Sequence, residues 1–98
     1  MVVLEILLIH LKPEITSKST RTGFEGFDFV VYVDTVIYNR GGSGKVTVWA
    51  QVIQGSNEWS KKQDIYMDEE EMRSLTFTFR EFSFWDLSTG SYNVWTET

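Results

Sequence analysis

The sequence predicts an all-β protein, folded as one antiparallel β-sandwich of six to seven strands. Apolar and polar residues alternate along several segments, and turn-forming residues separate these segments, as in short strands of a sandwich. Aromatic residues make up 15% of the chain, and they favour strands. Alanine, the strongest helix former, occurs only at Ala50. A length of 98 residues allows one domain, spanning residues 1–98.

The first expected strand is Val2–Leu11, the longest apolar run of the chain. Ten residues are too few to cross a membrane as a helix. The run also has neither the basic start nor the small-residue cleavage site of a signal peptide. A strand buried on both faces fits it better. Pro13 and the polar stretch Ser17–Gly23 then predict a loop, with a short strand around Glu14–Thr16 as the alternative.

The second expected strand, Phe27–Asn39, has the clearest alternation. Its charged face is expected to lie in solvent and its apolar face in the core, because successive side chains of a strand point to opposite sides. The solvent face carries Asp28, Tyr32, Asp34 and Tyr38, and the core face carries Phe27, Phe29, Val31, Val33, Thr35 and Ile37.

A glycine-rich turn, Arg40–Gly44, leads into the third expected strand, Lys45–Ile53. We expect the second and third strands to pair as a hairpin. The glycines are expected to supply positive φ in the turn, and Asn39 to hydrogen-bond its own backbone or the loop. Alternation points Val46, Val48, Ala50 and Val52 to one side and Lys45, Thr47, Trp49 and Gln51 to the other.

Three more strands and three turns complete the expected fold. The strands are Trp59–Met67, Arg73–Phe82 and Ser91–Thr96, and the turns are Gln54–Asn57, Asp68–Glu71 and Asp86–Gly90. Lys61 and Lys62 interrupt the first of these strands, which therefore has polar residues on both faces and is expected at a sheet edge. Strands of this number and spacing are typical of an immunoglobulin-like sandwich. A closed barrel is the alternative.

Short motifs along Phe27–Thr96 follow a recognisable order. They read Ile37-Tyr38-Asn39-Arg40-Gly41, Val46-Thr47-Val48, Leu75-Thr76-Phe77-Thr78-Phe79 and Gly90-Ser91-Tyr92-Asn93-Val94. This order resembles the cell-adhesion-related domain of bacteria and archaea (CARDB), and the resemblance implies an immunoglobulin or fibronectin type III-like sandwich. Two features depart from that family. The turn Asp68–Glu71 lacks its Pro-Gly, and the family usually adds a final strand where this sequence stops. We expect the sheet edge beside the last strand, where the family has its final strand, to be filled by Val2–Leu11 or left open.

Charge and composition argue against several functions. A net charge of −5 opposes nucleic-acid binding, which needs clustered basic residues. The chain has no cysteine, which excludes disulfides and thiolate metal sites.

His10 is the only histidine, and we expect it to be a strand residue with a satisfied hydrogen bond rather than a metal ligand. Gly41–Lys45 resembles the end of a phosphate-binding loop, but a strand follows it where a helix is required. We expect no catalytic residue, metal or cofactor.

An acidic run, Asp68–Glu71, stands between two expected strands. It lacks the spaced Asp/Asn and glycine pattern of a calcium loop. A solvated turn is the main interpretation, and a weak divalent-cation site is the alternative.

Four aromatic side chains form the candidate binding surface. Alternation places Trp49 and Trp95 outward, and we expect both in one sheet. Tyr32 and Tyr38 are expected outward on the other sheet. Exposed aromatics bury into a protein partner or stack on sugar rings, unless loops or the first strand cover them. The remaining tryptophans, Trp59 and Trp85, are expected to plug the open ends of the sandwich.

These observations predict a non-enzymatic interaction or spacer module, with a carbohydrate-binding module using Trp49 and Trp95 as the alternative. A protein partner or a second copy is expected to pair along Ser91–Thr96, which has fewer charged residues than Trp59–Met67. We expect neither nucleic-acid binding nor membrane insertion. The compartment is left open. The family resemblance implies an extracytoplasmic location for a domain of a longer protein, and a chain alone without a signal is expected in the cytoplasm.

Overall fold

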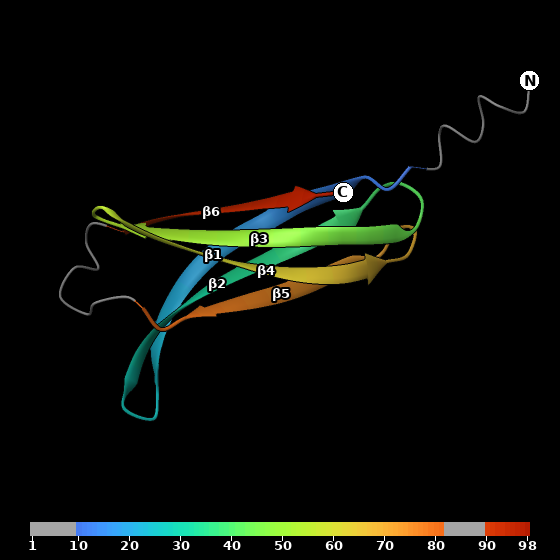
Figure 1. Cartoon of the computed structure of the whole chain (residues 1–98). Coiled ribbons are helices and arrows are strands. Elements are labelled where there is room, and N and C mark those ends of the chain that lie inside the picture. Colours follow the sequence, from blue (N-terminus) through green and yellow to red (C-terminus); the bar gives the residue numbers. More distant parts are fainter. Residues whose placement is uncertain (1–9, 82–89) are drawn as a thin grey trace, which may run out of the picture.

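Two three-stranded antiparallel sheets pack as the two layers of a β-sandwich (Figure 1). The computed structural model describes residues 10–81 and 90–98. One sheet has the strand order β1-β2-β5 and the other the order β4-β3-β6. The predicted all-β sandwich is confirmed, with six strands among the described residues. They are β1 (Pro13–Glu25), β2 (Asp28–Asn39), β3 (Gly44–Gln54), β4 (Asn57–Met67), β5 (Met72–Phe79) and β6 (Gly90–Glu97).

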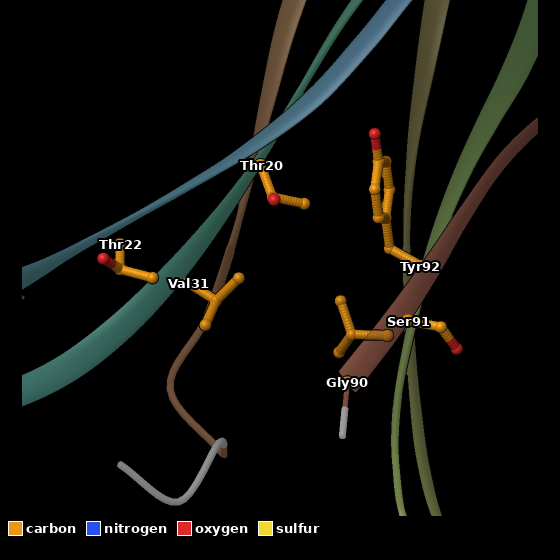
Figure 2. A pocket seen from close by; sticks show the side chains of 7 residues that line it. Thr20, Thr22, Val31, Gly90, Ser91 and Tyr92 are labelled. Carbon is orange, nitrogen blue, oxygen red and sulfur yellow. The ribbon is translucent and has the colours of Figure 1, made fainter. Parts of the chain in front are cut away.

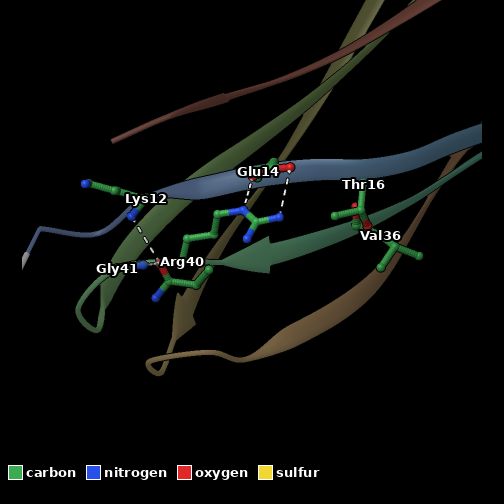
Figure 3. A network of polar contacts seen from close by, with 7 residues as sticks. Lys12, Glu14, Thr16, Val36, Arg40 and Gly41 are labelled. Atoms are coloured by element: carbon green, nitrogen blue, oxygen red, sulfur yellow. Dashed lines mark hydrogen bonds and ion pairs between the residues drawn. The ribbon is translucent and has the colours of Figure 1, made fainter.

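β1 is a long strand where the sequence predicts mostly a loop. Ser17–Gly23, the expected loop, pairs continuously with β2, so this prediction is wrong. The stretch is polar because β1 is an edge strand whose side chains are mostly exposed. A β-bulge between Ile15 and Ser17 leaves Thr16 without a register partner. Its Oγ1 donates to the carbonyl of Val36 at 3.2 Å (Figure 3).

β1 and β2 are joined by a two-residue turn, Gly26–Phe27, which projects beyond the end of the sandwich (Figure 1). Gly26 has a φ of 65°, a conformation that glycine adopts without steric cost. The alternation predicts Phe27 in the core, but its side chain is fully exposed. The prediction fails because Phe27 belongs to the turn, where the alternation of a strand no longer decides which side is buried.

The inner faces of β2, β3 and β5 supply most of the core. The predicted inward residues of β3 are all buried, and so are those of β2 from Val31 onward. Thr35, the polar member, donates from Oγ1 to the carbonyl of Ser17 at 2.9 Å, which compensates the burial of its hydroxyl. The buried cluster consists of Val33, Ile37, Val46, Val48, Ala50, Val52, Met67, Leu75, Phe77, Phe79 and Val94.

β2 and β3 do not form the predicted hairpin. β2 pairs with β1 and β5, whereas β3 pairs with β4 and β6, so the segment between them crosses from one layer to the other. Asn39, which is fully buried, holds this crossing. Its Nδ2 donates to the carbonyls of Gly42 and Asp68 at 2.9 Å. Its Oδ1 accepts from the backbone N–H groups of Lys12 and Gly41 at 3.1 Å.

Close backbone approach, rather than positive φ, explains the glycine at position 41. The described glycines with positive φ are Gly26 and Gly55, so the predicted reason is wrong. A Cβ on Gly41 would overlap the carbonyl oxygen of His10. That carbonyl accepts from the N–H of Gly42 at 3.0 Å, and the carbonyl of Lys12 accepts from the N–H of Arg40 at 3.0 Å. The chain entering β1 is therefore held against the β2–β3 loop, beside Arg40 and Glu14 (Figure 3).

The other predicted elements are β4, β5 and β6, with boundaries shifted by up to three residues. β4 is at a sheet edge as predicted, and the acidic run forms a turn between β4 and β5. His10 is exposed and precedes β1 rather than lying in a strand. The predictions for residues 2–9, Phe82, Trp85 and the start of the turn Asp86–Gly90 fall outside the described residues. Within the described ranges, no helix is long and apolar enough to cross a membrane.

Replacing Asn39 by alanine is expected to lower the free energy of unfolding by about 3 kcal/mol, because each buried group left without its partner costs about 1–3 kcal/mol. Urea unfolding monitored by tryptophan fluorescence measures the loss. Asn93→Ala is the matched control, since Asn93 is exposed on β6 and its loss should stay within about 0.5 kcal/mol. Equal losses in the two variants would contradict the role assigned to Asn39.

Candidate functional site

Trp49 and Trp95 form a stacked pair on the outer face of the β4-β3-β6 sheet. They are register partners on β3 and β6, which confirms the predicted placement in one sheet. Their ring centroids are 5.8 Å apart and their planes differ by 4°. Both residues are half-buried. Aromatic pairs of this kind contribute about 0.5–1.5 kcal/mol beyond the area that they bury, so the pair stabilises the sheet irrespective of any partner.

Trp49 has a neighbour on each side in this sheet. Lys62 of β4 is its register partner opposite Trp95, and the Lys62 ammonium lies 5.5 Å from the Trp49 ring centroid. The indole N–H of Trp49 is buried and has no hydrogen-bond acceptor in the described part of the structure. The row Lys62–Trp49–Trp95 therefore runs across the whole sheet, from the edge strand β4 to the edge strand β6.

Tyr32 and Tyr38 lie on β2, in the sheet opposite to the tryptophans, as predicted. The guanidinium of Arg21 lies 4.3 Å from the Tyr32 ring centroid, and that of Arg40 lies 5.3 Å from the Tyr38 centroid. The Tyr32 hydroxyl donates to Glu25 at 2.8 Å, and this hydrogen bond is the main cause of the raised pKa of Tyr32. Arginine side chains thus cover both predicted tyrosines.

A charged network connects the strands of that same outer face. Arg21 Nε donates to Asp34 Oδ2 at 2.7 Å, and Thr76 Oγ1 donates to Asp34 Oδ1 at 2.7 Å. The hydrogen bond from Arg21, followed by that from Thr76, lowers the pKa of Asp34. β1, β2 and β5 each contribute one member, so the network ties the three strands together.

The acidic turn is organised by Glu71. Its Oε1 accepts from the backbone N–H of Asp68 at 2.8 Å and its Oε2 accepts from Arg73 at 2.6 Å. These bonds lower the pKa of Glu71, the Asp68 N–H having the larger effect. Residues 10–81 and 90–98 contain no group of three or more metal-ligating side chains. The turn residue Glu70 has a positive φ of 56°.

The two long sides of the sandwich differ in how they are closed. On the side of β4 and β5, Lys61 Nζ donates to the carbonyl of Thr78 at 2.6 Å, and Gln63 Nε2 donates to that of Thr76 at 2.9 Å. Lys61 also pairs with Glu81 at 3.6 Å. Side chains of β4 thus cap outward carbonyls of β5, which blocks further strand pairing at this side.

The opposite side, between β1 and β6, contains an open groove of about 180 Å³, which we call the β1–β6 groove. Its floor is made by the buried side chains of Val31 and Val52. Figure 2 shows Thr20 and Val31 on one sheet facing Tyr92 on the other. Two contacts between Tyr92 and Lys18 bridge the sheets here. The Tyr92 hydroxyl donates to the carbonyl of Lys18 at 3.3 Å, and the Lys18 ammonium lies 5.6 Å from the Tyr92 ring centroid. The lining residues are Thr20, Thr22, Val31, Val52, Gly90, Ser91 and Tyr92.

Among the four edge strands, β6 has the least protection against pairing with another strand. β1 begins with Pro13, carries Lys18 and has a bulge. β4 carries two lysines, and its contacts also cover β5. β6 contains neither lysine, arginine nor proline, the residues that commonly guard an edge. In the described part of the chain it pairs with β3 alone.

Two surfaces were not identified from the sequence. The β1–β6 groove requires β1 to be a strand, whereas its polar composition predicts a loop. The other surface is the tip of the β1–β2 hairpin, where Phe24 and Phe27 are strongly exposed and Phe24 packs edge-on against Phe29 at 5.6 Å. Gly26 between two phenylalanine-containing segments was the available signal for this turn.

A double-mutant cycle on Trp49 and Trp95, using alanine at each position, is expected to give a coupling energy of about 1 kcal/mol, the range measured for stacked aromatic pairs. Chemical unfolding of the two single variants and the double variant measures it. Trp49→Phe, which keeps a ring and removes the indole N–H, should lose clearly less stability than Trp49→Ala. A coupling energy near zero would show that the rings do not stabilise each other.

Asp34→Asn is expected to lower stability by about 1 kcal/mol at pH 7, because it removes the negative charge facing Arg21. The pKa of Asp34 is lowered in the folded state, so this contribution is present above the unfolded pKa of about 3.9 and is lost as the pH falls through the folded value. Unfolding of both proteins between pH 7 and pH 2 measures it. Their difference should shrink below about pH 4. The exposed control Glu58→Gln should change stability at pH 7 by less than about 0.5 kcal/mol.

Comparison with models of known protein families finds no match for this chain, and comparison with curated proteins finds none. The resemblance to the cell-adhesion-related domain therefore stays a prediction from the sequence motifs.

Proposed function

We propose that the protein is a non-enzymatic interaction module that binds an extended peptide segment along β6. The bound segment would add a fourth strand to the β4-β3-β6 sheet and place apolar side chains in the β1–β6 groove. The observation that carries this proposal is the coincidence of an unguarded edge strand with a groove whose floor reaches the buried core. Strand addition supplies backbone hydrogen bonds for affinity and uses side-chain pockets for specificity.

Strand order supports the same location. We infer an immunoglobulin-like sandwich, in which one sheet contains strands A, B and E and the other contains C, F and G. β1, β2 and β5 take the places of A, B and E, and β3 and β6 take those of C and F, with β4 beside β3. In that arrangement the position next to β6 belongs to a further strand. A bound segment at this edge would extend the sheet in a geometry that the fold already accommodates.

The tryptophan row also favours an added strand at β6. Cross-strand pairs are the unit that stabilises a sheet, and the row Lys62–Trp49–Trp95 ends on the edge strand. A side chain of a bound segment opposite Trp95 would continue the row. In this proposal Trp95 contributes to binding through its side facing away from Trp49.

The carbohydrate-binding alternative has less support from this geometry. A sugar platform requires an aromatic face that is open to solvent. Trp49 lies between Lys62 and Trp95 in register, and both predicted tyrosines have an arginine over the ring. Titration with oligosaccharides, read by tryptophan fluorescence, tests the alternative, and binding that requires Trp95 would favour it over strand addition.

Selection of random nine-residue peptides against the full chain tests the proposal. Peptides with alternating apolar residues should be enriched, and their binding should slow amide exchange in β6. Thr20→Trp, which fills the groove, should weaken binding by at least about tenfold, since burying one large apolar side chain is worth about 1.5–3 kcal/mol.

Ser19→Trp is the matched control, because Ser19 is the exposed neighbour of Thr20 on β1 and does not line the groove. It should leave peptide binding unchanged. The proposal is wrong if no peptide is enriched, or if enriched peptides bind Thr20→Trp as well as the unaltered chain. Protection of β4 instead of β6 would equally contradict it.

A further inference from the structure

We infer that the segment occupying the β1–β6 groove is Val2–Ile9 of a second copy of this chain. The inference rests on the proposed function, since it uses the same edge and groove, and it names the partner.

The groove requires apolar side chains at alternate positions of its occupant. Val31 and Val52 form its floor, and Thr20, Thr22 and Tyr92 stand around them. A volume of about 180 Å³ is comparable to cavities of roughly 150 Å³ that bind a benzene molecule, so one large aliphatic side chain fits. Alternate residues of a strand share a face, so the residues two positions before and after that side chain also turn toward the sandwich and are best apolar.

Val2–Ile9 has this pattern in the sequence. Leu4, Ile6 and Leu8 share one alternation class, whereas Glu5, the only charge in the segment, belongs to the other. Insertion of the first class into the groove leaves Glu5 on the outer side of the added strand, where it keeps its water. The segment thus satisfies the apolar requirement without burying a charge.

Chain length prevents this segment from filling the groove of its own copy. His10 and Lys12 are hydrogen-bonded to the β2–β3 loop, at the end of the sandwich where β1 begins and β6 ends. Thr20 lies ten residues further along the chain, which is about 30–34 Å of strand. Residues 2–9 span at most about 29 Å even when fully extended, and they would first have to reverse direction.

A second copy removes this restriction. The segment can approach the β6 edge of a neighbouring copy from outside, with no reversal of the chain at His10. The contact is heterologous, because a terminal segment of one copy binds a groove of the other. Such contacts close when two copies exchange segments reciprocally and otherwise propagate from copy to copy. In both cases association depends on protein concentration and on the same side chains.

Sedimentation of the full chain over a range of concentrations, with matched segment variants, tests the inference. The unaltered chain should associate. Ile6→Lys should weaken association by at least about 100-fold, since it removes a buried aliphatic side chain and would bury a charge. Leu7→Lys, the same change on the other alternation class, should weaken it by less than about tenfold. Thr20→Trp should act like Ile6→Lys, and Ser19→Trp like the unaltered chain.

Cross-linking identifies which copy donates the segment, and the absence of native cysteine makes the reaction specific. Chains carrying Ile6→Cys are mixed with chains carrying Ser91→Cys and treated with a short bismaleimide. Cross-links between the two chains are expected. A single chain carrying both cysteines should also link to other copies, and links confined within one chain would overturn the inference.

The two proposals fail in different ways. If the unaltered chain stays monomeric, or if Ile6→Lys and Leu7→Lys associate equally, the second copy is not the partner. The interaction module still stands in that case provided that the selected peptides bind β6 in a Thr20-dependent manner. If neither the peptides nor a second copy uses the groove, both proposals are wrong.

Discussion

The arrangement of the two layers depends on the buried side chain of Asn39. Its amide makes four hydrogen bonds, two donated and two accepted, which is the full capacity of an amide group with two N–H donors and two lone pairs. The partners come from the chain entering β1, the loop between β2 and β3, and the turn after β4. One side chain thus fixes three segments at the same end of the sandwich. It also directs the chain out of β2 into the opposite layer rather than into a hairpin.

The sandwich is closed unevenly along its two long sides, and this asymmetry makes one side a candidate for binding. Lys61 and Gln63 of β4 reach across to two carbonyls of β5, so these two backbone acceptors are already paired within the chain. Between β1 and β6, a 3.3 Å hydrogen bond from Tyr92 to the Lys18 carbonyl is accompanied by an open groove. An exposed strand edge is a liability for a soluble domain. An edge without guards therefore favours a role in pairing with another segment.

The aromatic residues that first suggested a binding surface have mostly structural partners. Trp49 stacks on Trp95 and adjoins Lys62, and Tyr32 lies under Arg21 and donates to Glu25. Outward-facing aromatics on a sheet are therefore not free surfaces when long basic side chains from neighbouring strands cover them. In the proposed function Trp95 keeps a role because it lies on the edge strand β6. The side of Trp95 that faces away from Trp49 is the one that would contact the bound segment.

The sequence by itself determined the all-β class and the inward faces of β2 and β3, because alternation reflects the period of two that any strand imposes locally. The lysines of β4 indicated its edge position, and the expected sandwich topology placed Trp49 and Trp95 in one sheet. Only the tertiary structure decided that Ser17–Gly23 is a strand, because an edge strand can be polar on both faces and then resembles a loop. It also decided that β2 and β3 lie in different layers, since the bonds of Asn39 join segments distant in sequence. The β1–β6 groove exists where the edge of β6, which the sequence predicts, meets an edge of β1 that the local pattern does not reveal.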